Sequence, residues 1–136
     1  MSHIVHAVDF DKTLTVYHGG NRQPGVIGAP IEPMVQRVKD WLAAGETVKI
    51  FTARVTPSNP NAGRERMAIK RWCKETFGRD LEITAIKEPD FHDIWDDRAV
   101  SVEPNTGRVL TVFPDREISS HGVSHSSEQS FDMGVA

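Results

Sequence analysis

Short apolar runs alternate with helical repeats along the first ninety residues of the chain. The runs at residues 4–8, 47–51 and 81–86 predict buried strands, because each is short, rich in β-branched residues and followed by polar positions. Apolar residues recur at helical spacing over residues 31–42 and 67–77, which predicts two helices. Strand, helix, strand, helix, strand is the pattern of a parallel sheet with helices packed on its faces. We therefore expect an α/β fold, a three-layer Rossmann-like parallel sheet with helices on both faces.

The pattern weakens after the third predicted strand. Residues 92–96 and 99–102 predict short strand pieces, and a turn at EPNTG leads into a predicted final strand at 108–113. Residues 13–30 are rich in glycine and proline and predict a loop or small flap. Residues 117–136 are rich in serine and histidine, and residues 119–130 are poor in core-forming side chains, so we expect 117–136 to be a mobile tail.

Length and charge narrow the class of protein. A chain of 136 residues predicts one domain, over residues 1–116, ahead of the tail. The net charge of −3 excludes a general attraction to polyanions or anionic lipid. No apolar stretch is long enough to span a bilayer, the start lacks a signal-peptide pattern, and the lone Cys73 cannot form an internal disulfide. We expect a cytoplasmic protein that does not enter a membrane.

Polar side chains gather where the predicted strands end. In open α/β sheets, ligands bind beyond the carboxyl ends of the strands, so these residues are candidates for function. They are Asp9, Asp11 and Thr13 after the first strand, Thr52 and Arg54 after the second, Lys87 after the third, and Asp96 and Asp97 after the fourth. Four carboxylates in a shared cleft repel one another, and Mg²⁺ is the natural remedy, because zinc would want cysteine and histidine ligands. A hydroxyl and an ammonium beside them suit a phosphoryl group.

These residues resemble a known family. The segments DFDKTLT at 9–15, FTAR at 51–54 and IWDDRAV at 94–100, with Lys87 between them, are similar to the four ordered motifs of the haloacid dehalogenase (HAD) superfamily. The resemblance covers residues 4–102 and implies a HAD-like fold that hydrolyses phosphomonoesters with Mg²⁺. Residues 13–30 are too few for a helical lid, so we expect a minimal cap or none.

The resemblance also implies a role for each residue. Asp9 would be the nucleophile that attacks phosphorus, and Asp11 the general acid and then the base. Thr52 would hydrogen-bond the transferring phosphoryl group, and Lys87 would offset negative charge. The expected Mg²⁺ ligands are Asp9, Asp11, Asp96 and Asp97, and the expected substrate-binding residues are Thr13 and Arg54.

Several alternatives stay open. Only residues 88–91 separate Lys87 from the next predicted strand, whereas a parallel crossover usually takes a dozen residues, so Lys70 is the alternative lysine. Arg54 and Asp97 could instead be structural counter-charges. A phosphoacceptor receiver domain carries its acidic pair at the first strand and its acceptor aspartate later in the chain. Here the order is reversed, because the acidic pair Asp96 and Asp97 follows the predicted acceptor Asp9. A non-catalytic binding module with this fold would typically have lost Asp9 or Asp11.

The substrate is open as well. A phosphorylated small molecule or nucleotide is the first expectation. Residues 64–79 also hold six basic residues against two acidic ones, which fits either a nucleic-acid end as substrate or an ordinary solvated helix face. An open cleft that relies on a second subunit for closure would make the protein a homo-oligomer.

Overall fold

The structure is a computed structural model that describes residues 3–111. The chain divides into two compact units, with the boundary along the sequence between Asp97 and Arg98, and each unit is described separately. The predicted tail at 117–136, and residues 112–116 of the predicted domain, lie outside the described residues.

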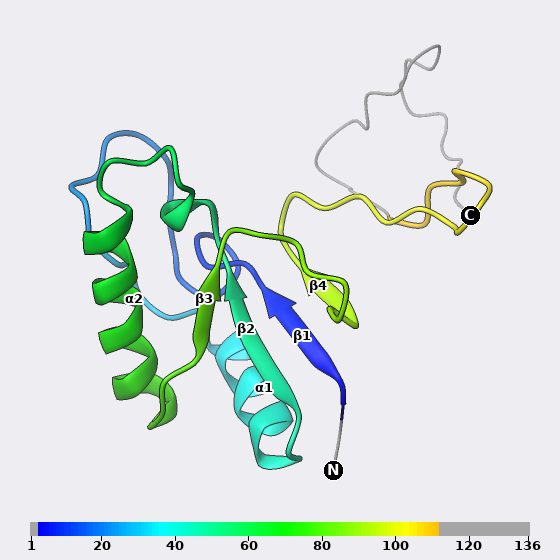
Figure 1. Cartoon of the computed structure of the whole chain (residues 1–136), viewed down its shortest axis with the longest axis horizontal. Helices are drawn as coiled ribbons and strands as arrows, with labels where there is room; N and C mark the ends of the chain where they lie inside the picture. Colours follow the sequence, from blue (N-terminus) through cyan, green and yellow to red (C-terminus); the bar gives the residue numbers. More distant parts are fainter. Residues whose placement is uncertain (1–2, 112–136) are drawn as a thin grey trace. The chain divides into compact units, whose positions relative to one another are not determined.

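The first unit is built on a four-stranded sheet in which every strand is parallel to its neighbours. The strands are β1 (Val5–Val8), β2 (Thr47–Phe51), β3 (Glu82–Thr84) and β4 (Asp93–Trp95), in the order β3-β2-β1-β4 (Figure 1). The predicted α/β class is confirmed. Because the strands are parallel, all their carboxyl ends lie at one edge of the sheet, and β1 and β4 end side by side.

Two helices connect the strands, α1 (Glu32–Ala43) and α2 (Ala62–Phe77), with a 3₁₀ turn, η1 (Ala53–Val55), after β2. Pro33 lies in the first turn of α1, where its missing N–H costs nothing, and Gly78 ends α2 in a left-handed conformation at φ 76°. Among residues 3–111, no helix is long and apolar enough to cross a membrane.

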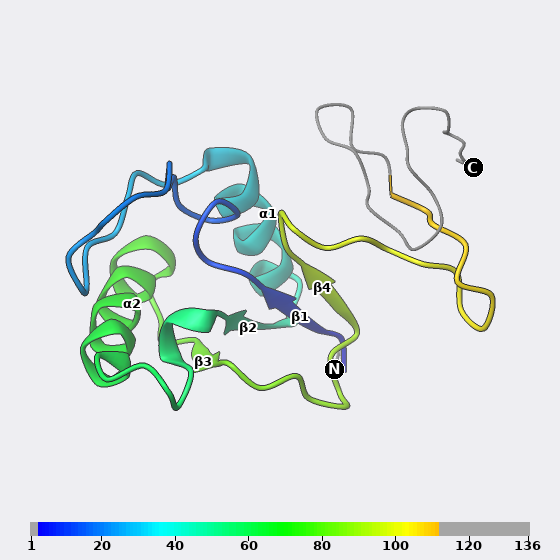
Figure 2. The same cartoon turned by 90° about the horizontal axis from the view of Figure 1, so that it is seen from above.

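Both helices lie on the same face of the sheet (Figure 2). The prediction of helices on both faces is therefore wrong for the part of the chain that the structure describes. The other face is covered by the segment 85–92, where the ring of Phe91 lies 5.4 Å from that of Phe51 and Glu88 accepts a hydrogen bond from Lys49 at 2.8 Å. No helix forms between β3 and β4, so this segment takes the place of the predicted third layer, which would have been helical.

The segment 85–92 also carries the chain from one edge of the sheet to the other. It must pass β2 and β1, three strand spacings or about 14 Å, and return along the length of a short strand. Eight extended residues reach about 27 Å, so a helix is not needed for this crossover.

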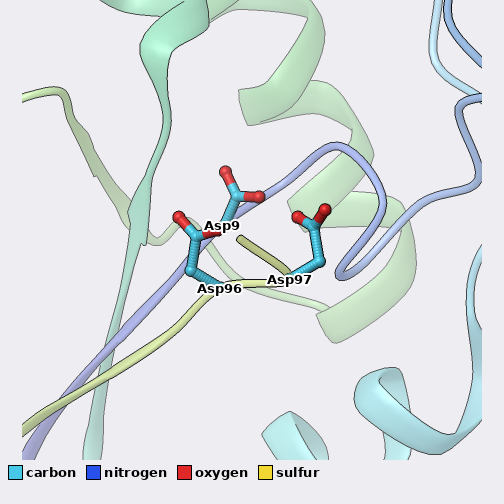
Figure 3. A group of neighbouring side chains, drawn as sticks. All are labelled: Asp9, Asp96 and Asp97. Carbon is cyan, nitrogen blue, oxygen red and sulfur yellow. The ribbon is translucent and has the colours of Figure 1, made fainter. Parts of the chain in front are cut away.

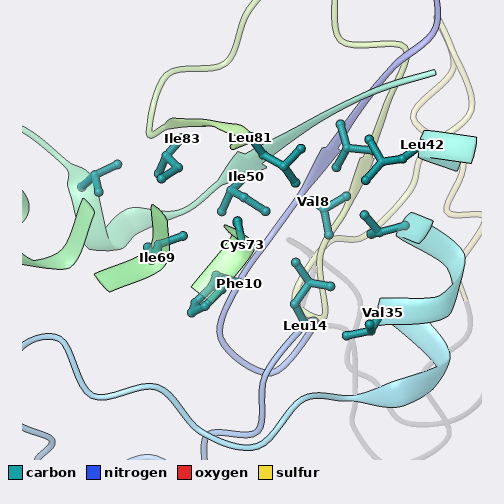
Figure 4. Close-up of a cluster of buried hydrophobic side chains, with 13 residues drawn as sticks. Val8, Phe10, Leu14, Val35, Leu42, Ile50, Ile69, Cys73, Leu81 and Ile83 are labelled. Atoms are coloured by element: carbon teal, nitrogen blue, oxygen red, sulfur yellow. The ribbon is translucent and has the colours of Figure 1, made fainter. Parts of the chain in front are cut away.

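The hydrophobic core lies between the sheet and the two helices (Figure 4). Val8, Ile50 and Ile83 are aligned across β1, β2 and β3, and they pack with Val35 of α1 and Ile69 of α2. Alternate strand residues point to opposite faces, which explains why neighbouring Lys49 and Phe51 face the segment 85–92 instead. This packing holds the ends of β1 and β2 rigidly beneath the candidate site.

A buried histidine fastens β4 to β1. The ring of His6 stacks on Trp41 with centroids 3.8 Å apart, and its two nitrogens lie 2.7 Å from Asp93 Oδ1 and 2.6 Å from Glu46 Oε1. A carboxylate only accepts hydrogen bonds, so both contacts are made when the ring carries both protons. The contact with Asp93 fixes the start of β4, and thereby the position of the residues that follow this strand.

The second unit holds little regular structure within residues 98–111. The strands predicted at 99–102 and 108–113 are wrong for the described residues, which form only one isolated antiparallel bridge, between Val102 and Val109. The turn between them is closed by the ion pair of Arg108 with Glu103 at 3.2 Å. Too few consecutive residues pair for a strand.

The segment between β1 and α1 doubles back on itself close to the strand ends. Val16 donates a backbone hydrogen bond to the carbonyl of Ala29 at 2.8 Å, and Ile31 donates to that of Leu14 at 2.8 Å. Gly28 makes this approach possible, because a Cβ at this position would lie 2.0 Å from the carbonyl oxygen of Val16.

Replacing Gly28 with alanine should lower the free energy of unfolding by about 2 kcal/mol, because the added methyl group displaces backbone rather than a flexible side chain. Urea unfolding measures the change. Gly63→Ala is the matched control, since its added Cβ meets open space in the first turn of α2 and should stabilise by up to about 1 kcal/mol. Equal effects of the two substitutions would contradict the close approach at Gly28.

Candidate active site

Three aspartates converge at the carboxyl ends of β1 and β4. Asp9 follows β1, and Asp96 and Asp97 follow β4; the backbone N–H of Asp9 donates to the carbonyl of Trp95 at 2.9 Å and continues the pairing of the strands. One carboxylate oxygen from each aspartate lies within 4.8 Å of the others. Figure 3 shows the three side chains side by side on two neighbouring segments. Adjacent parallel strands thus bring together residues almost ninety positions apart.

A tight turn after β1 directs Thr13 back into this group. The carbonyl of Phe10 accepts backbone hydrogen bonds from Thr13, Leu14 and Thr15, and Lys12 takes a left-handed conformation at φ 70°. The hydroxyl of Thr13 lies 3.3 Å from a carboxylate oxygen of Asp9 and 3.3 Å from one of Asp97, and it accepts the backbone N–H of Asp97 at 3.2 Å. The hydroxyl has a single proton, so it can donate to only one of the two carboxylates at a time.

The burial and the negative charges of this group affect the pKa of Asp9. The pKa of Asp9 is raised from 3.8 to about 7, first by burial of the carboxyl group and then by the negative charge of Asp96, with Asp97 adding to the effect. A backbone hydrogen bond at Phe10 opposes the shift without cancelling it. In the absence of a cation, the folded protein therefore holds a proton at Asp9 into the neutral range.

Asp11 lies outside this group. Both of its carboxylate oxygens accept hydrogen bonds from Arg54, from Nε at 2.8 Å and from Nη2 at 2.7 Å. The structure therefore does not bring Asp11 together with the other expected Mg²⁺ ligands, because a guanidinium already satisfies its side chain. The same contacts place Arg54 as a structural counter-charge: its side chain is 3% exposed, too little to reach a substrate from solvent.

The other two predicted catalytic residues lie in different surroundings. Thr52 follows β2, directly beside β1, and its buried hydroxyl accepts the backbone N–H of Arg54 at 3.2 Å. Lys87 is exposed and follows β3, which β2 separates from β1. The alternative, Lys70, is exposed on α2. Of these three residues, only Thr52 follows a strand adjacent to β1, the strand that Asp9 follows.

Sequence reasoning missed Glu65. It is a buried residue of α2, and one of its carboxylate oxygens accepts a hydrogen bond from Arg54 Nη1 at 3.0 Å. A signal was present, because Glu65 lies one helical turn before Ile69 and two before Cys73, on the buried stripe of the helix. A charged residue on such a stripe needs a partner of opposite charge.

The basic residues between 64 and 79 are all exposed, on α2 and just after it. Arg66 directs a guanidinium nitrogen at the carbonyl of Ile83, an intramolecular contact of β3. These positions do not distinguish a nucleic-acid surface from a solvated helix face, so that expectation stays a prediction.

The residues present fit a hard divalent cation. Asp9, Asp96 and Asp97 offer oxygen ligands only, the class that Mg²⁺ prefers, and no cysteine or histidine belongs to the group. A divalent cation would offset the repulsion between these converging carboxylates. Comparisons of the chain with protein-family models, with curated proteins and with solved structures find no match.

In metal-free protein, Asp9→Asn and Asp11→Asn should change stability in opposite directions. The wild type should lose stability as pH rises from about 4 to about 7, because the unfolded chain releases the Asp9 proton in this range while the folded chain keeps it. Asp9→Asn removes that loss. Asp11→Asn should instead cost about 2 kcal/mol throughout, because it weakens the pairing of a buried guanidinium.

Urea unfolding in excess chelator at several pH values tests this contrast. A destabilised Asp9→Asn protein at neutral pH, or an unchanged Asp11→Asn protein, would contradict the different electrostatic surroundings assigned to Asp9 and Asp11.

Proposed function

We propose that this protein is a Mg²⁺-dependent phosphohydrolase that cleaves phosphomonoesters through an aspartyl-phosphate on Asp9. The observation that carries the proposal is the convergence of Asp9, Asp96 and Asp97 at the carboxyl ends of two neighbouring strands, with the hydroxyl of Thr13 between Asp9 and Asp97. Such a group suits a divalent cation, and a cation held there could in turn bind the oxygens of a phosphoryl group. The order of the motifs along the chain supports the same reading.

In the proposed reaction, a carboxylate oxygen of Asp9 attacks phosphorus and the bond from phosphorus to the alcohol oxygen breaks. Asp11, protonated at the start of the reaction, gives its proton to the departing oxygen and becomes the carboxylate that pairs with Arg54. Water then attacks the phosphorus of the aspartyl-phosphate and passes a proton to Asp11, and the bond to Asp9 breaks. Inorganic phosphate leaves and Asp9 returns as a carboxylate. Attack requires the carboxylate form of Asp9, which a bound cation would favour over the protonated form that the raised pKa favours in metal-free protein.

Mg²⁺, held by Asp9, Asp96 and Asp97, would neutralise the carboxylates and the phosphoryl oxygens. Thr13 holds Asp9 and Asp97 in their relative positions through its hydroxyl. The hydroxyl of Thr52 accepts from Arg54, so its own proton can be donated to a phosphoryl oxygen. In this proposal Lys87 approaches the phosphoryl group from the exposed loop after β3, and the substrate is a phosphorylated small molecule or nucleotide.

A panel of phosphomonoesters assayed with Mg²⁺ and with excess chelator tests the activity. We expect turnover only with Mg²⁺, loss of at least about 10³-fold with Asp9→Asn, and a raised Mg²⁺ requirement with Asp96→Ala. Glu75→Gln, an exposed change on α2, is the control for the preparation. Full activity in chelator, or unchanged turnover by a folded Asp9→Asn protein, would refute the proposal.

Asp11→Asn should affect substrates according to their leaving groups. An alkyl phosphate needs a proton on its departing oxygen, so its kcat should fall by about 10²-fold, whereas an activated aryl phosphate should lose much less. Steady-state kinetics on the two substrates measure the ratio. Equal losses on both would mean that Asp11 serves only as the partner of Arg54.

A further inference from the structure

Glu65 is a buried carboxylate to which the proposed reaction assigns no role. Its side chain is 4% exposed. It accepts hydrogen bonds from Arg54 Nη1 at 3.0 Å and from the backbone N–H of Gly25 at 3.1 Å, both on Oε1, and it pairs with Arg22 Nη1 at 2.9 Å through Oε2. Glu65 on α2 thus contacts two earlier parts of the chain, at Arg54 eleven positions before it and at Gly25 forty positions before it.

These contacts form a continuous series of alternating charges. Asp11 in the turn after β1 binds Arg54 after β2, Arg54 binds Glu65 on α2, and Glu65 binds Arg22 in the loop before α1. Arg54 also lies over the ring of Phe10, with 5.3 Å from Cζ to the ring centroid. The guanidinium is therefore held in its plane by a ring and at its edges by two carboxylates.

We propose that Glu65 is a positioning residue that acts on the leaving-group step through Arg54. This inference rests on the proposed function. Two parallel hydrogen bonds from a guanidinium set both the place and the plane of a carboxylate. Glu65 holds the outer nitrogen of Arg54, so it fixes the plane in which Arg54 presents its other two donors to Asp11. Glu65 is too buried to touch a substrate, and its effect reaches the reaction only through this pair.

The same carboxylate connects the loop of residues 17–28 to Asp11. Gly25 packs on the first turns of α2, where a Cβ would lie 3.5 Å from the side chain of Arg64, and its N–H is bound by the oxygen that also binds Arg54. A displacement of the loop therefore removes one donor from Glu65 and changes how firmly Glu65 holds Arg54. The loop position and the orientation of Asp11 are linked.

Glu65→Gln tests the kinetic part of the inference, because it keeps the shape of the side chain and removes its charge. We expect kcat for an alkyl phosphate to fall by about tenfold, with little change in kcat for an activated aryl phosphate and in KM for either. Glu75→Gln makes the same chemical change at an exposed position of α2 and should leave the ratio of the two substrates unchanged. A merely structural role would lower both activities equally, and that result would overturn the inference.

A second measurement does not depend on catalysis. The Nε–H resonance of Arg54 in a ¹⁵N-correlated NMR spectrum reports its bond to Asp11. It should shift and exchange faster with water in Glu65→Gln, and stay unchanged in Glu75→Gln. Glu65→Asp, which keeps the charge but shortens the reach, should give a smaller shift of the same kind, and it serves if Glu65→Gln does not fold. An unmoved resonance in a folded variant would overturn the inference.

The two measurements separate this inference from the proposed function. A wild-type protein without phosphatase activity, but with an Arg54 resonance that responds to Glu65, would refute the proposed function and keep the Glu65–Arg54–Asp11 linkage. A wild-type phosphatase whose Arg54 resonance and leaving-group ratio ignore Glu65 would refute the linkage alone.

Discussion

The buried guanidinium of Arg54 determines how charge is distributed at the carboxyl ends of the strands. It binds Asp11 by two hydrogen bonds and Glu65 by a third, so the protein itself neutralises these carboxylates. Asp9 and Asp97 share the hydroxyl of Thr13, and Asp96 lies beside them with a carboxylate oxygen within 4.8 Å of theirs. The site therefore has one half in which a buried guanidinium pairs with two carboxylates, beside another half in which three carboxylates converge and could hold a metal ion.

The order of the strands makes this division possible. Because β1 lies between β2 and β4, the turn after β1 can present Asp11 toward Arg54 on one side and Asp9 toward Asp96 on the other. The short crossover at 85–92 permits this order without a further helix. The structure thus places Asp9 and Asp11, two residues apart, in different electrostatic surroundings.

Much of this arrangement could be predicted from the sequence, because it follows from local patterns. The apolar runs and helical repeats identified β1, α1, β2 and α2, and the strand-end rule identified Asp9, Asp96 and Asp97 as neighbours. Charge pairing could not be predicted in the same way. Whether Arg54 turns to a substrate or to Asp11 depends on how α2 packs, since Glu65 completes its surroundings from eleven residues away. The number of layers also depended on whether residues 85–92 formed a helix.

Chemical trapping of the aspartyl-phosphate tests the central claim most directly. The protein is incubated with Mg²⁺ and an activated aryl phosphate, quenched in acid and reduced with borohydride, which converts an aspartyl-phosphate to homoserine. The account predicts homoserine at position 9 and at no other aspartate, in proportion to the enzyme held as aspartyl-phosphate when the acid is added. Turnover of the substrate with aspartate intact at position 9 would contradict it, because phosphorus would then be attacked by water directly.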